Sequence, residues 1–115
     1  MYRQKFSTLL IALTLILPVS NVFAQVDEYG FTRTERNDIN AQATEPFQIF
    51  DNVYFVGIKA VASYVIKTSE GLILIDTLDG FEGFTDNLLE NIRTVGLDPA
   101  GIRYVIVMQA HRDHY

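Results

Sequence analysis

Apolar residues between positions 46 and 77 occur in short runs separated by turn residues, which is the pattern of β-strands. The last two runs flank Ser-Glu-Gly, so a short hairpin is expected, with Gly71 supplying a backbone conformation that other residues avoid. Few helix formers occur in this region, and we therefore predict an antiparallel start to a sheet. The predicted strands are Phe47–Phe50, Val53–Gly57, Ser63–Thr68 and Leu72–Thr77.

The apolar period then changes to that of an amphipathic helix, which Gly96 and Pro99 are well suited to end. The run Ile102–Met108 is almost entirely apolar and rich in Val and Ile, which is typical of a strand covered on both faces. Strand, helix and strand in this order predict a β-α-β unit, in which Leu72–Asp76 and Ile102–Met108 lie parallel across a right-handed crossover. The predicted apolar helix face consists of Phe84, Leu88, Leu89, Ile92 and Val95.

Residues 1–24 have the pattern of a secretory signal peptide. Arg3 and Lys5 precede the apolar run Leu9–Val19, and the Val-Phe-Ala sequence that ends at Ala24 suits cleavage there. A membrane anchor is the alternative, but the run is shorter than the roughly 20 apolar residues that a span needs. We therefore expect a cleaved signal peptide and a periplasmic or secreted protein without a membrane anchor.

The charge of the remaining chain narrows the possible partners. The whole sequence has nine Lys and Arg residues against 14 Asp and Glu, a formal charge of −5, and removal of Arg3 and Lys5 makes it about −7. Such a chain is poorly suited to nucleic acid or to an anionic membrane surface. No cysteine occurs, which excludes disulfide bonds and a cysteine-linked lipid anchor.

The mature chain is too short to form more than one small hydrophobic core. Residues 25–45 are polar, mix charges and lack an apolar period, so we predict a flexible mature N-terminus there. Residues 46–115 then form a single domain or part of one.

Polar residues follow two strands of the predicted sheet. Asp76 comes after Leu-Ile-Leu-Ile, and the segment Gln109–His114 comes after Tyr-Val-Ile-Val-Met. Functional sites of α/β sheets gather beyond the carboxyl ends of parallel strands, so we expect both groups in one crevice.

The types of side chain in this segment indicate a metal site. His111, Asp113 and His114 offer imidazole and carboxylate groups, the usual zinc ligands, and their close spacing suits two adjacent ions better than one. A hydrophilic surface loop is the alternative, but two histidines around an aspartate at a strand end favour metal. Asp76 either caps a turn or supports a metal ligand from behind.

The sequence resembles the metallo-β-lactamase superfamily, which has the motif H-x-H-x-D-H after a buried strand. This chain reads QAHRDH in that register, and IFDNVYFVG, SYVIKTSEGLILIDT and GLDPAGIRYVIV resemble the preceding strands and helix of the family. The similarity covers about residues 46–115. It implies an α+β chain, the N-terminal half of an αββα sandwich, in which hairpins are followed by the β-α-β unit.

The resemblance also implies roles for individual residues. Gln109 and His111 would face a first zinc ion, while Asp113 and His114 would face a second one. Asp113 would also orient the metal-bound hydroxide, and Asp76 matches the strand-end aspartate near the metals. Gln109 stands where the family usually has histidine, although some lactamases of the third subclass also have glutamine there. Its amide oxygen is a weaker donor toward zinc than an imidazole.

Arg112 lies between these residues, and the sequence leaves two roles open for it. It either contacts the carboxylate of an anionic substrate or turns outward and pairs with an acid.

The function that the resemblance implies is that of a secreted zinc-dependent hydrolase which opens β-lactam rings by metal-hydroxide attack. Alternatives are hydrolysis of another ester, lactone or thioester, or a non-catalytic periplasmic binding protein on the same fold. The partner would be a small-molecule substrate, and the oligomeric state is left open. The family takes further zinc ligands from later loops, so we expect an N-terminal fragment that alone neither folds stably nor hydrolyses substrate.

Overall fold

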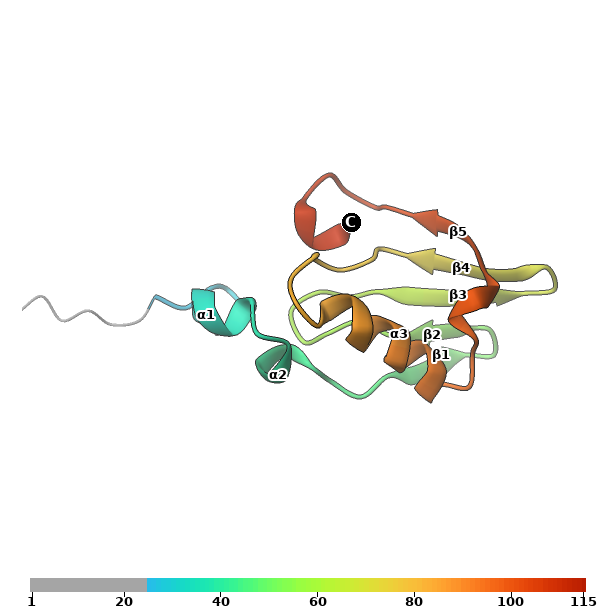
Figure 1. The fold of residues 1–115 in the computed structure, drawn as a ribbon, viewed down its shortest axis with the longest axis horizontal. Coiled ribbons are helices and arrows are strands. Elements are labelled where there is room, and N and C mark those ends of the chain that lie inside the picture. Colours follow the sequence, from blue (N-terminus) through green and yellow to red (C-terminus); the bar gives the residue numbers. More distant parts are fainter. Residues whose placement is uncertain (1–24) are drawn as a thin grey trace, which may run out of the picture.

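The computed structural model describes residues 25–115, and the predicted signal peptide, residues 1–24, lies outside them. The described chain forms one five-stranded sheet in the order β1-β2-β3-β4-β5 (Figure 1). Neighbouring strands are antiparallel except for β4 and β5, which are parallel. The strands are β1 Phe47–Phe50, β2 Val53–Phe55, β3 Tyr64–Thr68, β4 Gly71–Ile75 and β5 Ile102–Ile106.

The hairpin between β3 and β4 has the predicted form. Thr68 pairs with Gly71 across a loop of two residues, and Gly71 has a φ of 132°. A Cβ atom on Gly71 would lie 2.8 Å from the carbonyl oxygen of Gly101, so glycine is needed both for its backbone conformation and for space.

Helix α3, Phe84–Thr94, is the predicted crossover helix between β4 and β5. Val95 is its C-terminal cap, and Gly96 follows with a φ of 79°, which is typical of a glycine that terminates a helix. A short 3₁₀ helix, η1 Pro99–Gly101, leads from there into β5. The predicted β-α-β unit is therefore confirmed.

The hydrophobic core lies between α3 and one face of the sheet. Asn91 of α3 is also buried there and donates hydrogen bonds to the carbonyl oxygens of Val56 and Gly57, at 3.0 and 3.1 Å. The buried apolar residues are Tyr54, Val56, Ile58, Val61, Val65, Leu72, Leu74, Leu78, Phe84, Leu88 and Ile92.

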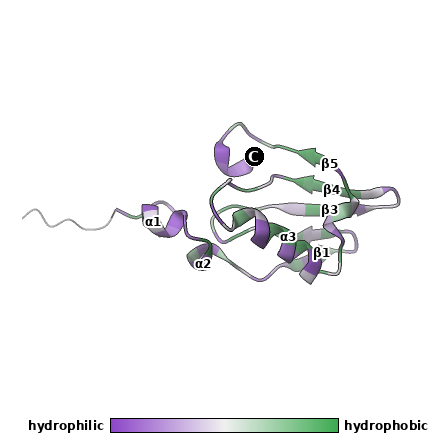
Figure 2. Cartoon of the chain, viewed as in Figure 1, coloured by the Kyte–Doolittle hydropathy of each residue, from purple (hydrophilic) through white to green (hydrophobic). Residues whose placement is uncertain are grey.

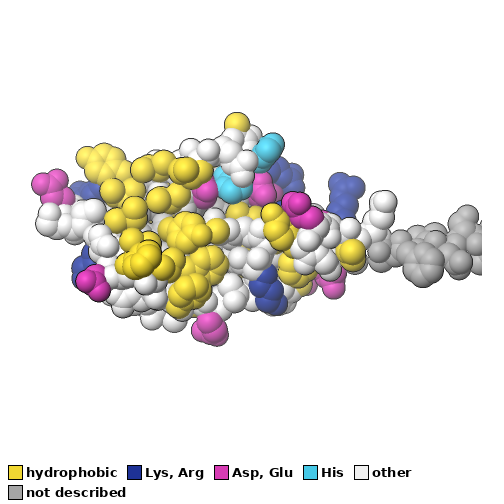
Figure 3. Space-filling view, turned by 180° about the vertical axis from the view of Figure 1, so that it is seen from behind, with side chains coloured by type: hydrophobic (Ala, Val, Ile, Leu, Met, Phe, Trp, Pro, Cys, Tyr) yellow, Lys and Arg dark blue, Asp and Glu magenta, His cyan; other side chains and the backbone are white. Residues whose placement is uncertain are grey.

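The opposite face of the sheet is apolar but uncovered within residues 25–115 (Figure 3). Paired residues on neighbouring strands point to the same side of a sheet, so the registers identify this face. Its most exposed members lie on the two edge strands, and Phe50 and Tyr104 are both 68 % exposed. The residues are Phe47, Phe50, Val53, Phe55, Tyr64, Ile66, Ile73, Ile75, Tyr104 and Ile106, and we call them the open face.

The expectation that β5 is covered on both faces is therefore wrong for the described chain. β5 is an edge strand that pairs only with β4, and it also ends at Ile106, two residues earlier than predicted. Tyr104 and Ile106 belong to the open face, and Val105, on the other side, is still 50 % exposed.

Residues 25–45 contain regular structure that the apolar pattern did not predict. They form two one-turn helices, α1 Arg33–Arg36 and α2 Ile39–Gln42 (Figure 1). Thr32 and Glu35 form a capping box at the start of α1, and the side chain of Asp38 caps α2. Both helices begin at side-chain caps, and Figure 2 shows α1 as largely hydrophilic. In α2, Ile39 also packs against the hydrophobic core.

Among residues 25–115, no helix has the length and apolar character needed to cross a membrane.

Candidate metal centre

Asp76 connects the ends of β4 and β5, as the sequence predicts. Its backbone N–H donates to the carbonyl oxygen of Ile106 at 2.9 Å, and its carboxylate Oδ1 accepts from the N–H of Met108 at 2.7 Å. Asp76 is 5 % exposed and has a positive φ of 58°. The buried Ser63 hydroxyl holds this turn by donating to the carbonyl oxygen of Asp76 at 2.7 Å.

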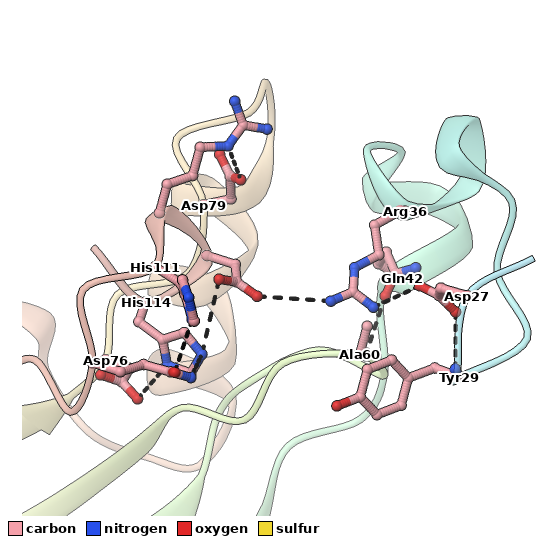
Figure 4. Close-up of polar contacts among 12 residues, drawn as sticks. Asp27, Tyr29, Arg36, Gln42, Ala60, Asp76, Asp79, His111 and His114 are labelled. Carbon is pink, nitrogen blue, oxygen red and sulfur yellow. Dashed lines mark hydrogen bonds and ion pairs between the residues drawn. The ribbon is translucent and has the colours of Figure 1, made fainter.

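The second carboxylate oxygen of Asp76 is directed at the motif loop. Oδ2 lies 2.7 Å from Nδ1 of His114 (Figure 4). The loop is also fixed by its backbone, because the N–H of Thr77 donates to the carbonyl oxygen of His114 at 3.0 Å. A carboxylate accepts only, so Nδ1 of His114 is the donor in this contact.

Gln109 links the two imidazoles. Its amide Nε2 lies 2.6 Å from Nε2 of His114, and its Oε1 lies 2.9 Å from Nδ1 of His111. The amide nitrogen can only donate and the amide oxygen can only accept. In these contacts Nδ1 of His111 donates to Gln109 Oε1, and Nε2 of His114 accepts from the Gln109 amide. The contact with Gln109 thus occupies the His114 nitrogen that lies away from Asp76.

Asp113 lies in the 3₁₀ turn η2, Arg112–His114, and its side chain lies between His114 and the N-terminal segment. Its Oδ1 is 4.0 Å from Nε2 of His114, and its Oδ2 is 3.7 Å from Nη2 of Arg36. About a third of the Asp113 side chain is exposed. The two oxygens of this carboxylate thus face different partners.

The motif residues fit a zinc site in the kind of donors that they offer. Two imidazoles, a carboxylate and an amide oxygen lie together at one edge of the sheet, and one imidazole is supported by a carboxylate, as is usual for metal-binding histidines. Within residues 25–115, however, no three His, Cys, Asp or Glu side chains converge closely enough to hold one ion. The chemistry of the donors fits zinc, whereas their number around one point does not complete a site.

Arg112 turns away from this cluster, as one of its two possible roles requires. Its Nε donates to Asp79 Oδ2 at 3.0 Å, and its guanidinium lies 4.4 Å from the ring centre of Phe81. Arg112 therefore pairs with an acid on the outer side of the motif loop.

A cleft of about 550 Å³ opens over the motif residues. Gln109, His111, Asp113 and His114 form one part of its wall. The other part comes from the connection between β2 and β3 and from the N-terminal segment, which contributes Tyr29 and Arg36. Lys59 also lines the cleft. Neither Arg36 nor Lys59 could be predicted here from the sequence, because neither belongs to a motif and only the tertiary fold brings them to the site.

Comparison with known proteins agrees with the fold. No family model matches the sequence. The subclass B3 metallo-β-lactamase BJP-1 of Bradyrhizobium japonicum is 45 % identical with a TM-score of 0.58, over 62 % of this chain and 26 % of its own. The metallo-β-lactamase GOB-18 from Elizabethkingia meningoseptica is 38 % identical with a TM-score of 0.62, over 80 % and 32 % respectively.

A third similar structure is the class B3 di-zinc metallo-β-lactamase LRA-12 from an Alaskan soil metagenome, which is 28 % identical with a TM-score of 0.60. It is matched over 64 % of this chain and 27 % of its own. The chain therefore resembles the metallo-β-lactamase superfamily, and its fold is that of the N-terminal part of a metallo-β-lactamase. It spans about a quarter to a third of the length of these proteins.

Proposed function

We propose that this chain is the N-terminal part of a secreted, zinc-dependent hydrolase that opens β-lactam rings. The observation that carries the proposal is the connected arrangement of Asp76, His114, Gln109 and His111, which brings two imidazoles and an amide together beside a supporting carboxylate. Zinc at His114 Nε2 would replace the contact of that atom with the Gln109 amide. The similarity to three metallo-β-lactamases, two of them of class B3, supports the substrate class.

In this proposal the motif residues would hold zinc. His111 and His114 would bind it through an imidazole nitrogen, Asp113 through its carboxylate, and Gln109 through its amide oxygen. Zinc would supply a Lewis acid that polarises a carbonyl group and lowers the pKa of water. Other ligands come from parts of the longer protein outside this chain, since three protein ligands per catalytic zinc is usual.

The residues around the ligands have supporting roles. Asp76 keeps the proton of His114 on Nδ1 and holds the motif loop against the end of β4. Asp113 lines the cleft with Oδ1 on the side of His114 Nε2, and from there it would orient the attacking water. The small-molecule substrate occupies the cleft above them.

The experiment is hydrolysis of a chromogenic cephalosporin by the purified longer protein, with and without a chelator. We expect turnover that the chelator abolishes and that added zinc restores. Arg93→Ala, at an exposed position of α3, is a control that leaves turnover unchanged. Turnover that persists in chelator, or turnover only of ester, lactone or thioester substrates, would contradict the proposal.

The proposal of secretion has its own test. The mass of the protein recovered from the periplasm or medium should correspond to a chain that begins at Gln25. A protein that keeps residues 1–24 would rule out cleavage after Ala24.

A further inference from the structure

Arg36 connects the N-terminal segment to the motif loop. Its Nη1 donates to Asp27 Oδ2 at 2.7 Å, and its Nη2 lies 3.7 Å from Asp113 Oδ2 (Figure 4). The guanidinium also lies 5.0 Å from the ring centre of Tyr29, within the range of a cation–π contact. Arg36 thus stands between two carboxylates that are far apart in the sequence.

Asp27 is a well-defined partner for Arg36. The backbone N–H groups of Phe31 and Tyr29 donate to its other oxygen, Oδ1, at 3.0 and 2.9 Å. The hydrogen bond from Phe31 is the main cause that lowers the pKa of the Asp27 carboxyl, and Tyr29 and Arg36 act in the same direction. Asp27 therefore stays ionised and holds one side of the Arg36 guanidinium.

Gln42 fixes the helix that carries Arg36. Its side chain is fully buried, donates to the carbonyl oxygen of Glu35 in α1 and accepts from the N–H of Ala60, both at 3.2 Å. The carbonyl oxygen of Gln42 accepts from the N–H of Lys59 at 2.9 Å. These bonds attach α1 to the connection between β2 and β3, so Arg36 approaches Asp113 from a fixed base.

We infer that Arg36 is a positioning residue for Asp113. Its positive charge attracts Oδ2 of the carboxylate, and this leaves Oδ1 on the side of His114 Nε2. Without Arg36, the partly exposed Asp113 side chain is free to rotate into solvent. The role in zinc binding rests on the proposed function, whereas the orientation of the carboxylate does not.

The test compares Arg36→Ala, Arg36→Lys and Arg33→Ala in the longer protein. Arg33 lies on the same helix, and no ion pair with Asp113 is found for it among the described residues, so Arg33→Ala is the matched control. In the metal-free protein, the side-chain carboxyl ¹³C resonance of Asp113 should shift in Arg36→Ala and stay in place in Arg33→Ala. An unchanged resonance in Arg36→Ala would overturn the inference, whether or not the protein binds zinc.

The loaded protein provides a second measurement. Arg36→Ala should lower kcat about tenfold, the smaller effect typical of groups that support metal ligands, with little change in KM. Arg36→Lys keeps the charge and should recover part of the loss; it carries the same tests if Arg36→Ala does not fold. A rise in KM alone would mean that Arg36 binds substrate and does not position Asp113, while absence of zinc in the wild type would contradict the proposed function only.

Discussion

The two faces of the sheet differ in packing although both are apolar. On one face, α3 packs over the sheet: Val65 and Leu74 of the sheet are buried, and Ile92 of α3 is completely buried. On the open face, Tyr104 and Ile106 are 68 % and 46 % exposed. The motif loop leaves β5, an edge strand that is mostly exposed, yet Asp76 and the Thr77 N–H hold that loop from the end of β4. The site therefore depends on hydrogen bonds from the better packed strand more than on packing of its own strand.

The comparison also bears on the size of the functional unit. A sheet with apolar residues on both faces is typical of one that is covered on both faces. The matched region makes up only 26–32 % of each similar lactamase, so those proteins are about three to four times as long as the region that this chain matches. We propose that further residues of the longer protein cover the open face.

The largest expected effect is on the covered face. Ile92→Ala in the longer protein should lower the free energy of unfolding by about 2–5 kcal/mol, because Ile92 is fully buried and its truncation leaves a cavity. Ile106→Ala tests the other face by the same denaturant titration. A loss of under about 0.5 kcal/mol, the usual range for surface positions, would show that the open face stays uncovered in the longer protein.

A smaller effect is expected when the polar contact inside the covered face is removed. Asn91→Ala should destabilise the protein by about 1–3 kcal/mol, because the carbonyl oxygens of Val56 and Gly57 lose their donor. Thermal and denaturant unfolding would measure the loss. Glu90→Ala, next to it on the exposed side of α3, is the control, and equal losses in the two variants would contradict this account.

The link between β4 and the motif loop can be broken without removing a predicted ligand. Asp76→Asn places an amide beside His114 Nδ1 and disturbs its tautomer, so the affinity for zinc should fall by about 10–100-fold. Competition with a chromogenic chelator measures this affinity. Asp98→Asn, in the cap of η1 and away from the site, should leave the affinity unchanged, and a similar change in both variants would argue against a role of Asp76 in the site.

The smallest effect is expected on the solvent side of α3. Arg93 and Glu90 form an exposed ion pair at 3.4 Å, and Arg93→Ala should change the free energy of unfolding by no more than about 0.5 kcal/mol. Denaturant titration at low and high salt would detect a larger, screened contribution if one exists.

Sequence patterns predicted the parts of the fold that depend on local periodicity. The hairpin at Gly71, the helix that ends at Gly96 and the meeting of Asp76 with the motif loop all follow from period, turn chemistry and parallel strand order. A register shift between Leu72 and Ile73 in the pairing with β5 could not be predicted. This shift places Tyr104 on the open face, although simple alternation from Ile102 would place it toward α3.

The contacts of the N-terminal segment could not be predicted from the sequence pattern either. The capping box at Thr32 and Glu35 could have indicated α1, because its spacing is a known helix start. The contact of Arg36 with Asp113 depends on the docking of Gln42 against Ala60, which joins distant parts of the chain. No local signal encodes such a contact.

The most direct test of the central claim is the zinc content of the longer protein, purified as the wild type and as the double variant His111→Ala/His114→Ala. We predict at least about one zinc per wild-type chain, as catalytic sites require, and a clear loss in the double variant. Equal zinc content in the two proteins, or a wild type with well under one zinc per chain, would contradict the assignment of this motif as a metal centre.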